Sequence, residues 1–230
     1  MHDDALKPGS LPVLLVVLTI TTGLIDAVSV LGLGRVFTAN MTGNIVFLGF
    51  ALARVPGFSL TRSLVALGAF LVGAVIGGRL GLRLNASQRR WFLIVAVVES
   101  SLLFAAALVA REFDSQTLVP VARLYALIAL TAVAMGVRNA TVRRLAVPDL
   151  TTTVLTLTLA GLGADSSLAG GSNPRWSRRI ISVAAMLGGA TLGGLLVLAR
   201  GLVWPLALTG AITLSATLAY VARPATGEGI

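Results

Sequence analysis

The chain has 230 residues, of which 56% are hydrophobic and 12% are charged, and its mean hydropathy is +0.93. This composition lies outside the range of soluble globular domains, so the chain is predicted to be an integral membrane protein. The formal net charge of +9 does not indicate nucleic-acid binding, because the basic residues stand singly or in pairs between apolar segments.

Eight apolar segments follow one another along the chain. Six approach the ~20 residues that a helix needs to cross a bilayer, and two are shorter. The long segments are 11–33, 64–82, 91–110, 121–142, 180–199 and 202–222, and the short ones are 40–53 and 150–163. The predicted fold is an all-α, polytopic membrane helix bundle with six full spans and two short helices, either re-entrant or broken. We expect one membrane domain, 11–222, between the tails 1–10 and 223–230.

The second half of the chain repeats the pattern of the first. The aligned stretches are Arg62–Leu80 with Arg178–Leu196, at an offset of 116 residues, and Asp26–Asn40 with Asn139–Thr153, at an offset of 113. Each half, about 11–110 and 121–222, thus contains a long, a short and two further long segments. The alternative is that small apolar residues align by chance, as they do in any membrane protein.

The basic residues indicate whether the short segments cross. If all eight segments crossed, these residues would divide equally between the two sides and give no orientation signal. If the short segments re-enter, the side of the N-terminus holds twelve, and the other side keeps Arg35, Arg54, Arg62, Arg111, Arg123 and Arg200. Cytoplasmic loops carry the excess of basic residues, so both termini are predicted to be cytoplasmic. Three crossings per half then make the internal repeat inverted, as in many secondary transporters.

The polar stretch before the first short helix is the main candidate for a solute site. Residues 34–40 are expected to enter the membrane as extended chain, which is tolerated only against protein or a water-filled cavity. Side-chain oxygens there are suited to capping the N-terminus of the first short helix. If the second short helix mirrors the first, the two helix N-termini face each other, and their positive dipole ends favour an anionic group between them. The candidate substrate-binding residues are Thr38, Asn40, Thr42, Asn44, Thr151, Thr152 and Thr153. Alternatively, these oxygens serve only helix ends and neighbouring helices.

Two stretches resemble a known family. They are GLIDAVSVLGLGRVFTANMTGNIVFLGFALA, at Gly23–Ala53, and AMGVRNATVRRLAVPDLTTT, at Ala134–Thr153. Both are similar to the YoaK-type family of bacterial inner-membrane proteins, described as of unknown function, and the block at Asn40–Asn44 is the most specific part. The resemblance implies a polytopic protein of the bacterial inner membrane and no established substrate. Where the family tends to carry Val-Thr-Gly-Thr, this chain has Val-Leu-Thr-Leu at Val154–Leu157.

Ionisable residues inside the long segments are the candidates for coupling. A charged residue costs about 2.5–3.5 kcal/mol at the centre of a spanning helix, and only two acids, Asp26 and Glu99, lie well inside. Our hypothesis is that Asp26 or Glu99 pairs with Arg138, or takes up a proton when the pair opens. The repeat places Asn139 opposite Asp26. The alternatives are a static ion pair for Asp26 and a protonated, hydrogen-bonded carboxyl for Glu99.

Glycines at a spacing of four allow helix backbones to approach closely. Such ladders occur at Gly73, Gly77 and Gly81 and at Gly189 and Gly193. They are expected to pack helices together within the chain, and a homodimer would use them equally well.

These features predict a secondary transporter or permease for a small solute, with an anion favoured by the helix ends. The alternative is a passive channel or structural membrane component without coupled transport. An enzyme is not expected, because the chain has no cysteine and its one histidine, His2, stands in the N-terminal tail. No metal and no cofactor are expected, and the expected partners are membrane lipid and an unidentified small-molecule solute.

Overall fold

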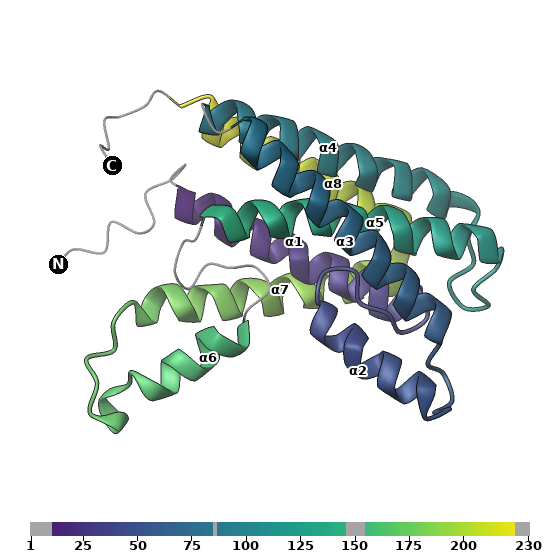
Figure 1. Ribbon diagram of the computed structural model, residues 1–230, viewed down its shortest axis with the longest axis horizontal. Coiled ribbons are helices and arrows are strands. Elements are labelled where there is room, and N and C mark those ends of the chain that lie inside the picture. Colours follow the sequence, from purple (N-terminus) through teal and green to yellow (C-terminus); the bar gives the residue numbers. More distant parts are fainter. Residues whose placement is uncertain (1–10, 85–86, 146–154, 224–230) are drawn as a thin grey trace.

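The computed structural model describes residues 11–84, 87–145 and 155–223, and it is helical throughout its regular parts (Figure 1). The helices within these ranges are α1 (Leu11–Gly32), α2 (Met41–Leu52), α3 (Leu60–Arg83), α4 (Gln88–Val109), α5 (Val121–Leu145), α6 (Leu155–Ala164), α7 (Trp176–Arg200) and α8 (Val203–Val221). The 3-10 turns are η2 (Ala110–Glu112) and η3 (Ser167–Ala169).

Six of these helices are long and apolar enough to cross a membrane, and α2 and α6 are shorter. The predicted all-α bundle of six long and two short helices is therefore confirmed. The helix bounds differ by a few residues, since α3 begins at Leu60 after the cap Ser59, whose hydroxyl accepts a hydrogen bond from the backbone N–H of Arg62. The second short helix begins at Leu155, and the part of the prediction on residues 150–154 lies outside the described ranges.

Each short helix covers only part of the length of the bundle. Figure 1 shows that α2 begins near the middle of the long axis and runs toward the end where α1 stops and α3 starts. The helix α6 also begins near the middle, and it runs to the opposite end, where α7 starts. Neither α2 nor α6 therefore spans the bundle.

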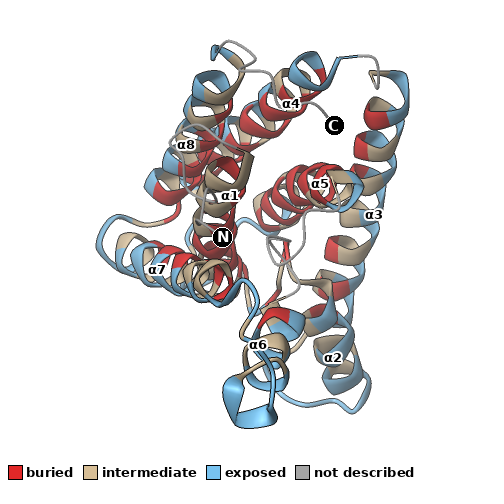
Figure 2. Cartoon of the chain, turned by 90° about the vertical axis from the view of Figure 1, so that its left-hand side faces the viewer, coloured by how far each residue is buried: buried red, intermediate tan, exposed pale blue. Residues whose placement is uncertain are grey.

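The third helix of each half packs against the first helix of the other half. The helix α3 packs along α5, α7 packs along α1, and α4 packs against α8. The short helices rest on the outer side of this assembly, α2 against α3 and α6 against α7. Figure 2, a view along the bundle, shows α1 and α5 as the most deeply buried helices and α2 and α6 together at the periphery.

The glycine ladders lie at the crossings of these exchanged helices. A Cβ on Gly73 would lie 2.1 Å from the carbonyl oxygen of Val133, and one on Gly189 would lie 2.0 Å from that of Ile20. Such distances exclude every side chain, because the two backbones are in contact there. Each ladder thus packs against a helix of its own chain.

The basic residues are divided unequally between the two ends of the bundle. The end at which α1 begins carries Arg79, Arg83, Arg89, Arg90, Arg143, Arg144, Arg175, Arg178, Arg179 and Arg223. The opposite end carries Arg35, Arg54, Arg62, Arg111, Arg123 and Arg200. Of the twelve basic residues expected on the first side, Arg138 is instead buried inside the bundle and Lys7 lies outside the described residues, but the excess that re-entrant short helices require is still present.

Candidate functional site

The segment between α1 and α2 turns back into the core. Residues 33–40 form no helix, and Leu33, Val36 and Ala39 are buried in the same hydrophobic cluster as side chains of α1, α4 and α5. The reversal is made at Gly34 and Arg35, which both have left-handed backbone conformations with φ of 76° and 59°. Non-helical backbone at this depth therefore lies against protein, as a membrane interior demands.

Asn44 holds this segment in place from within α2. Its Oδ1 accepts a hydrogen bond of 2.9 Å from the backbone N–H of Phe37, and its Nδ2 donates to the carbonyl oxygen of the same residue. The side chain is completely buried. Asn44 thus satisfies both backbone groups of a residue that has no helix or strand partner.

Asp26 holds the same segment from α1. The side-chain amide of Asn40 donates to Oδ2 of Asp26, and the backbone N–H of Ala39 also bonds to this carboxylate. Asn40 occupies the N-cap position of α2 but makes no capping bond with its side chain, so the expected cap is not formed there. The amide is committed to Asp26 instead, and Asp26 therefore bonds to this segment and not to Arg138.

Two buried oxygens near the start of α2 have no hydrogen-bond partner among the described residues. They are Oδ1 of Asp26 and Oγ1 of Thr38, in side chains that are at most 6% exposed. Thr42, by contrast, is exposed on the first turn of α2. The candidate residues Thr151, Thr152 and Thr153 lie outside the described part of the chain.

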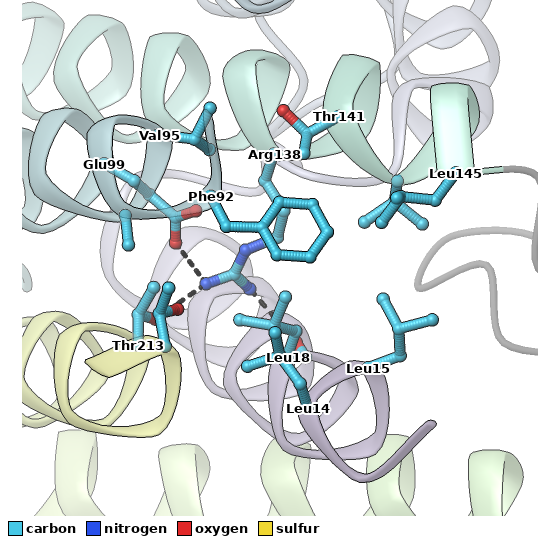
Figure 3. Close-up of a pocket in the computed structure, with 13 residues that line it drawn as sticks. Leu14, Leu15, Leu18, Phe92, Val95, Glu99, Arg138, Thr141, Leu145 and Thr213 are labelled. Carbon is cyan, nitrogen blue, oxygen red and sulfur yellow. Dashed lines mark hydrogen bonds and ion pairs between the residues drawn. The ribbon is translucent and has the colours of Figure 1, made fainter. Parts of the chain in front are cut away.

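A second polar centre lies deeper in the bundle, around Arg138 of α5 (Figure 3). Its guanidinium forms an ion pair with Glu99 of α4, and both side chains are at most 2% exposed. It also donates to the carbonyl oxygen of Leu18 and to the hydroxyl of Thr22, both at 3.1 Å, and to the hydroxyl of Thr213 at 2.9 Å. One side chain thus joins α1, α4, α5 and α8.

Glu99, and not Asp26, is the acid that pairs with Arg138. The neighbouring Asn139, which the repeat aligns with Asp26, donates from its Nδ2 to the carbonyl oxygen of Met135 at 2.8 Å. An amide at this position carries no charge. The two halves therefore differ in chemistry where the alignment places them on one another.

A cavity of about 30 Å³ opens beside the ion pair. Apolar side chains such as Leu14 and Phe92 line most of it, and Glu99, Arg138 and Thr217 contribute polar groups (Figure 3). The cavity lies on the side of the pair that faces the start of α1 and the end of α5. The other side is filled by completely buried side chains, among them Leu103, Ile128 and Leu206.

Arg179 positions the second short helix. Its guanidinium donates to the carbonyl oxygen of Gly161 at 2.6 Å and forms an ion pair of 2.7 Å with Asp165, so it ties the end of α6 to α7. The side chain is only 6% exposed. Arg179, one of the basic residues at the end where α1 begins, thus also fixes α6 in the structure.

Sequence reasoning missed the three threonines of α8. Thr209, Thr213 and Thr217 are buried, and Thr213 completes the shell around Arg138. Their spacing of four residues was the available signal, because it places three hydroxyls on one face of a helix. The signal is weak, since hydroxyls in helices often bond to their own backbone, as Thr209 does to Pro205.

We expect the replacement Asn44→Ala to loosen the segment before α2. It leaves the N–H and the C=O of Phe37 without partners, and each unsatisfied buried group costs about 1–3 kcal/mol. In an Ala39→Cys background, the thiol should therefore react faster with maleimide when Asn44 is replaced. The matched control is Thr42→Ala, on the exposed face of the same helix turn, and equal rates in the two variants would contradict the role of Asn44.

Among the described residues, no group of three His, Cys, Asp or Glu side chains is placed to hold a metal ion. The chemistry that this region offers is instead hydrogen bonding from threonine and asparagine, one buried arginine and two buried acids. Such groups are chemically able to form hydrogen bonds to a small polar solute or to exchange a proton.

Comparisons with known proteins give a family and no activity. The sequence model of the family described as "Protein of unknown function (DUF1275)" matches residues 14–219. The UPF0700 transmembrane protein YoaK of Bacillus subtilis (strain 168) is 36% identical over 157 residues, which are 67% of this chain and 66% of that protein. The match thus spans slightly less than two thirds of that relative. No solved structure matches the chain.

Proposed function

The chain belongs to the DUF1275 family of proteins of unknown function, and we propose that this multi-pass transmembrane protein is a secondary transporter or permease for a small anionic solute. One observation carries the proposal: both short helices begin near the middle of the bundle, and they run out to opposite ends of it (Figure 1). Interrupted helices that meet at the midplane are the usual sites of substrate in secondary transporters.

Inverted repetition of the two halves is part of this proposal. It is supported by the glycine crossings, since Gly73 meets Val133 and Gly189 meets Ile20. The first residues of these pairs differ by 116 positions and the second by 113, the two offsets at which the halves align. The first helices of the halves, α1 and α5, also run in opposite directions along the bundle (Figure 1).

The proposed orientation places both termini in the cytoplasm of a bacterium, with the protein in the inner membrane. The support is the excess of arginines at the end of the bundle where α1 begins, because basic residues are retained on the cytoplasmic side. The solute then passes between this end and the periplasmic one.

The start of α2 is the proposed solute site. A helix N-terminus attracts an anion through its dipole and its free N–H groups, and the side chain of Asn40 does not cap those of α2. The hydroxyl of Thr38, which has no partner among the described residues, is a further donor beside it. A bound anion adds a negative charge to an interior that already holds the buried acids Asp26 and Glu99, so uptake of a proton by a buried carboxyl of the bundle is the natural companion of the solute.

Charge movement in proteoliposomes tests the proposal. Currents on a solid-supported membrane are recorded while a panel of inorganic anions and short-chain carboxylates is added, with the corresponding neutral amides as controls. We expect at least one anion to give a saturable current that depends on the pH gradient. The current should be lost in Asp26→Leu and kept in Gly78→Ala, whose added methyl meets no atom within 4 Å.

Two outcomes would overturn the assignment. A flux that rises without saturation and ignores the pH gradient would indicate a passive channel. A panel in which no anion gives a current above that of protein-free liposomes would contradict transport of small anions.

A further inference from the structure

The Glu99–Arg138 pair is more accessible than its burial suggests, because both partners line a cavity. Arg138 binds Oε1 of Glu99, and no hydrogen bond to Oε2 is found among the residues that the structure describes. Glu99 contributes to the wall of the adjoining cavity (Figure 3). Water in the cavity is therefore able to approach the carboxylate of Glu99.

The cavity is large enough to hold water, and the polar part of its lining gathers at the ion pair. A water molecule needs about 10–15 Å³ of such volume and two to four polar partners. The cavity has about 30 Å³, which is room for roughly two waters. Glu99, Thr213 and Thr217 line the cavity and supply polar groups for water.

Access to this cavity is one-sided. It extends from the ion pair toward the start of α1, past Thr213 and Thr217 on one face of α8. On the opposite side of the pair, Leu103 and Leu206 are completely buried within a continuous hydrophobic cluster. On that side, the hydroxyl of Ser100 already donates a hydrogen bond of 2.9 Å to the carbonyl oxygen of Gly210, so it is not available to bind water as a donor.

Arg138 has hydrogen bonds besides its ion pair with Glu99. Besides Glu99 it has three uncharged acceptors, the oxygens of Leu18, Thr22 and Thr213. Two buried charges carry a large desolvation cost that their attraction offsets only in part. Protonation of Glu99 removes one charge from the interior, and the guanidinium then loses its charged partner but retains three uncharged acceptors that partly offset this loss.

We infer that Glu99 is the proton-binding residue of this chain, and that protons reach it through the hydrated cavity from the end of the bundle where α1 begins. The proton binds a carboxylate oxygen of Glu99, whose charge changes from −1 to 0, while Arg138 remains a cation. Of the ionisable groups on the neighbouring helices, Arg138 is the one that forms an ion pair with Glu99. Asp26 of α1 is instead bonded to Asn40, and the ring of Tyr220 of α8 packs on that of Phe92, with 5.5 Å between the ring centroids. This inference deepens the proposed function by naming the coupling carboxyl and its route.

Infrared difference spectroscopy on the reconstituted protein tests which carboxyl takes up the proton. The C=O stretch of a protonated carboxyl should appear in the wild type as the pH is lowered, persist in Asp26→Asn and vanish in Glu99→Gln. Because Glu99→Gln leaves Arg138 without a charged partner, the double variant Glu99→Gln/Arg138→Met is measured beside it and should also lack the band. A band that survives both Glu99 variants, or one that is lost in Asp26→Asn, would overturn the inference.

Thiol labelling tests the route. Thr217→Cys should react with Ag⁺, a thiol reagent no larger than a water molecule, only from the side that also labels Arg90→Cys, an exposed position at the end where α1 begins. Leu206→Cys, beyond the ion pair, should react from neither side. Reaction of Thr217→Cys from neither side, or only from the side that labels Arg111→Cys, would contradict the route.

These measurements separate the inference from the proposed function. Neither contains a solute, so a failure to find anion currents leaves both readouts interpretable. Conversely, absence of the Glu99 band would leave anion transport to be coupled through Asp26 or not at all.

Discussion

Replacing Arg138 by leucine is expected to lower the free energy of unfolding by about 3–5 kcal/mol, because it leaves the carboxylate of Glu99 buried and unpaired. The measurement is equilibrium unfolding in mixed micelles, followed by helical circular dichroism. The double variant Arg138→Met/Glu99→Leu should recover most of the loss, since buried ion pairs replaced by apolar side chains are often neutral in stability.

The matched control is Arg123→Leu. Arg123 also forms an ion pair with a glutamate, Glu112, but its side chain is 33% exposed and that of Glu112 is 74% exposed. Surface pairs contribute about 0–1 kcal/mol, so this variant should stay close to the wild type. Equal losses for Arg138→Leu and its double variant would show that packing, and not charge pairing, is what Arg138 provides.

The second large effect is expected at the glycine crossings. Gly73→Ala and Gly189→Ala place a methyl group about 2 Å from a backbone oxygen of the neighbouring helix, so the helices must separate. Overpacking of this kind costs about 1–3 kcal/mol. Both variants should unfold at lower denaturant concentration than the wild type, and by similar amounts, because the two crossings have the same geometry.

Neighbouring glycines on the same helices provide the controls. A methyl group added at Gly68 or Gly188 would have no neighbouring atom within 4 Å, so alanine meets nothing there. Since alanine favours a helix over glycine by about 0.5–1 kcal/mol, these variants should be as stable as the wild type or slightly more stable. A loss of stability at Gly68 or Gly188 as large as that at Gly73 or Gly189 would contradict the close crossings.

Most of the fold was predictable because the bilayer restricts what a chain can do. Segment length and apolarity located the six long helices and both short ones, and the small residues at Gly73 and Gly189 marked where helices touch. The sequence did not indicate which helices pack against one another. The exchange of α3 and α7 between the halves depends on how the two halves meet, which no local pattern encodes.

The candidate site was predictable in its residues and less so in its bonds. Asn40 and Asn44 were expected to serve the helix start with their oxygens, yet they bond to Asp26 and to the backbone of Phe37. Glu99 and Asp26 looked alike in sequence as partners for Arg138. Only the position of α4 beside α5 decides between them, because it brings Glu99 and not Asp26 to the guanidinium.

The proposed transport mechanism depends most directly on the opposite entry of the two short helices. The natural absence of cysteine allows single thiols to be placed at Gly49 and Gly163, near the outer ends of α2 and α6, where an added side chain meets no atom within 4 Å. Each variant is labelled with a membrane-impermeant maleimide in right-side-out and inside-out vesicles. Opposite entry predicts that Gly163→Cys reacts only from the side that labels Arg90→Cys, and Gly49→Cys only from the other. Labelling of both from the same side would contradict the midplane site and the transporter built on it.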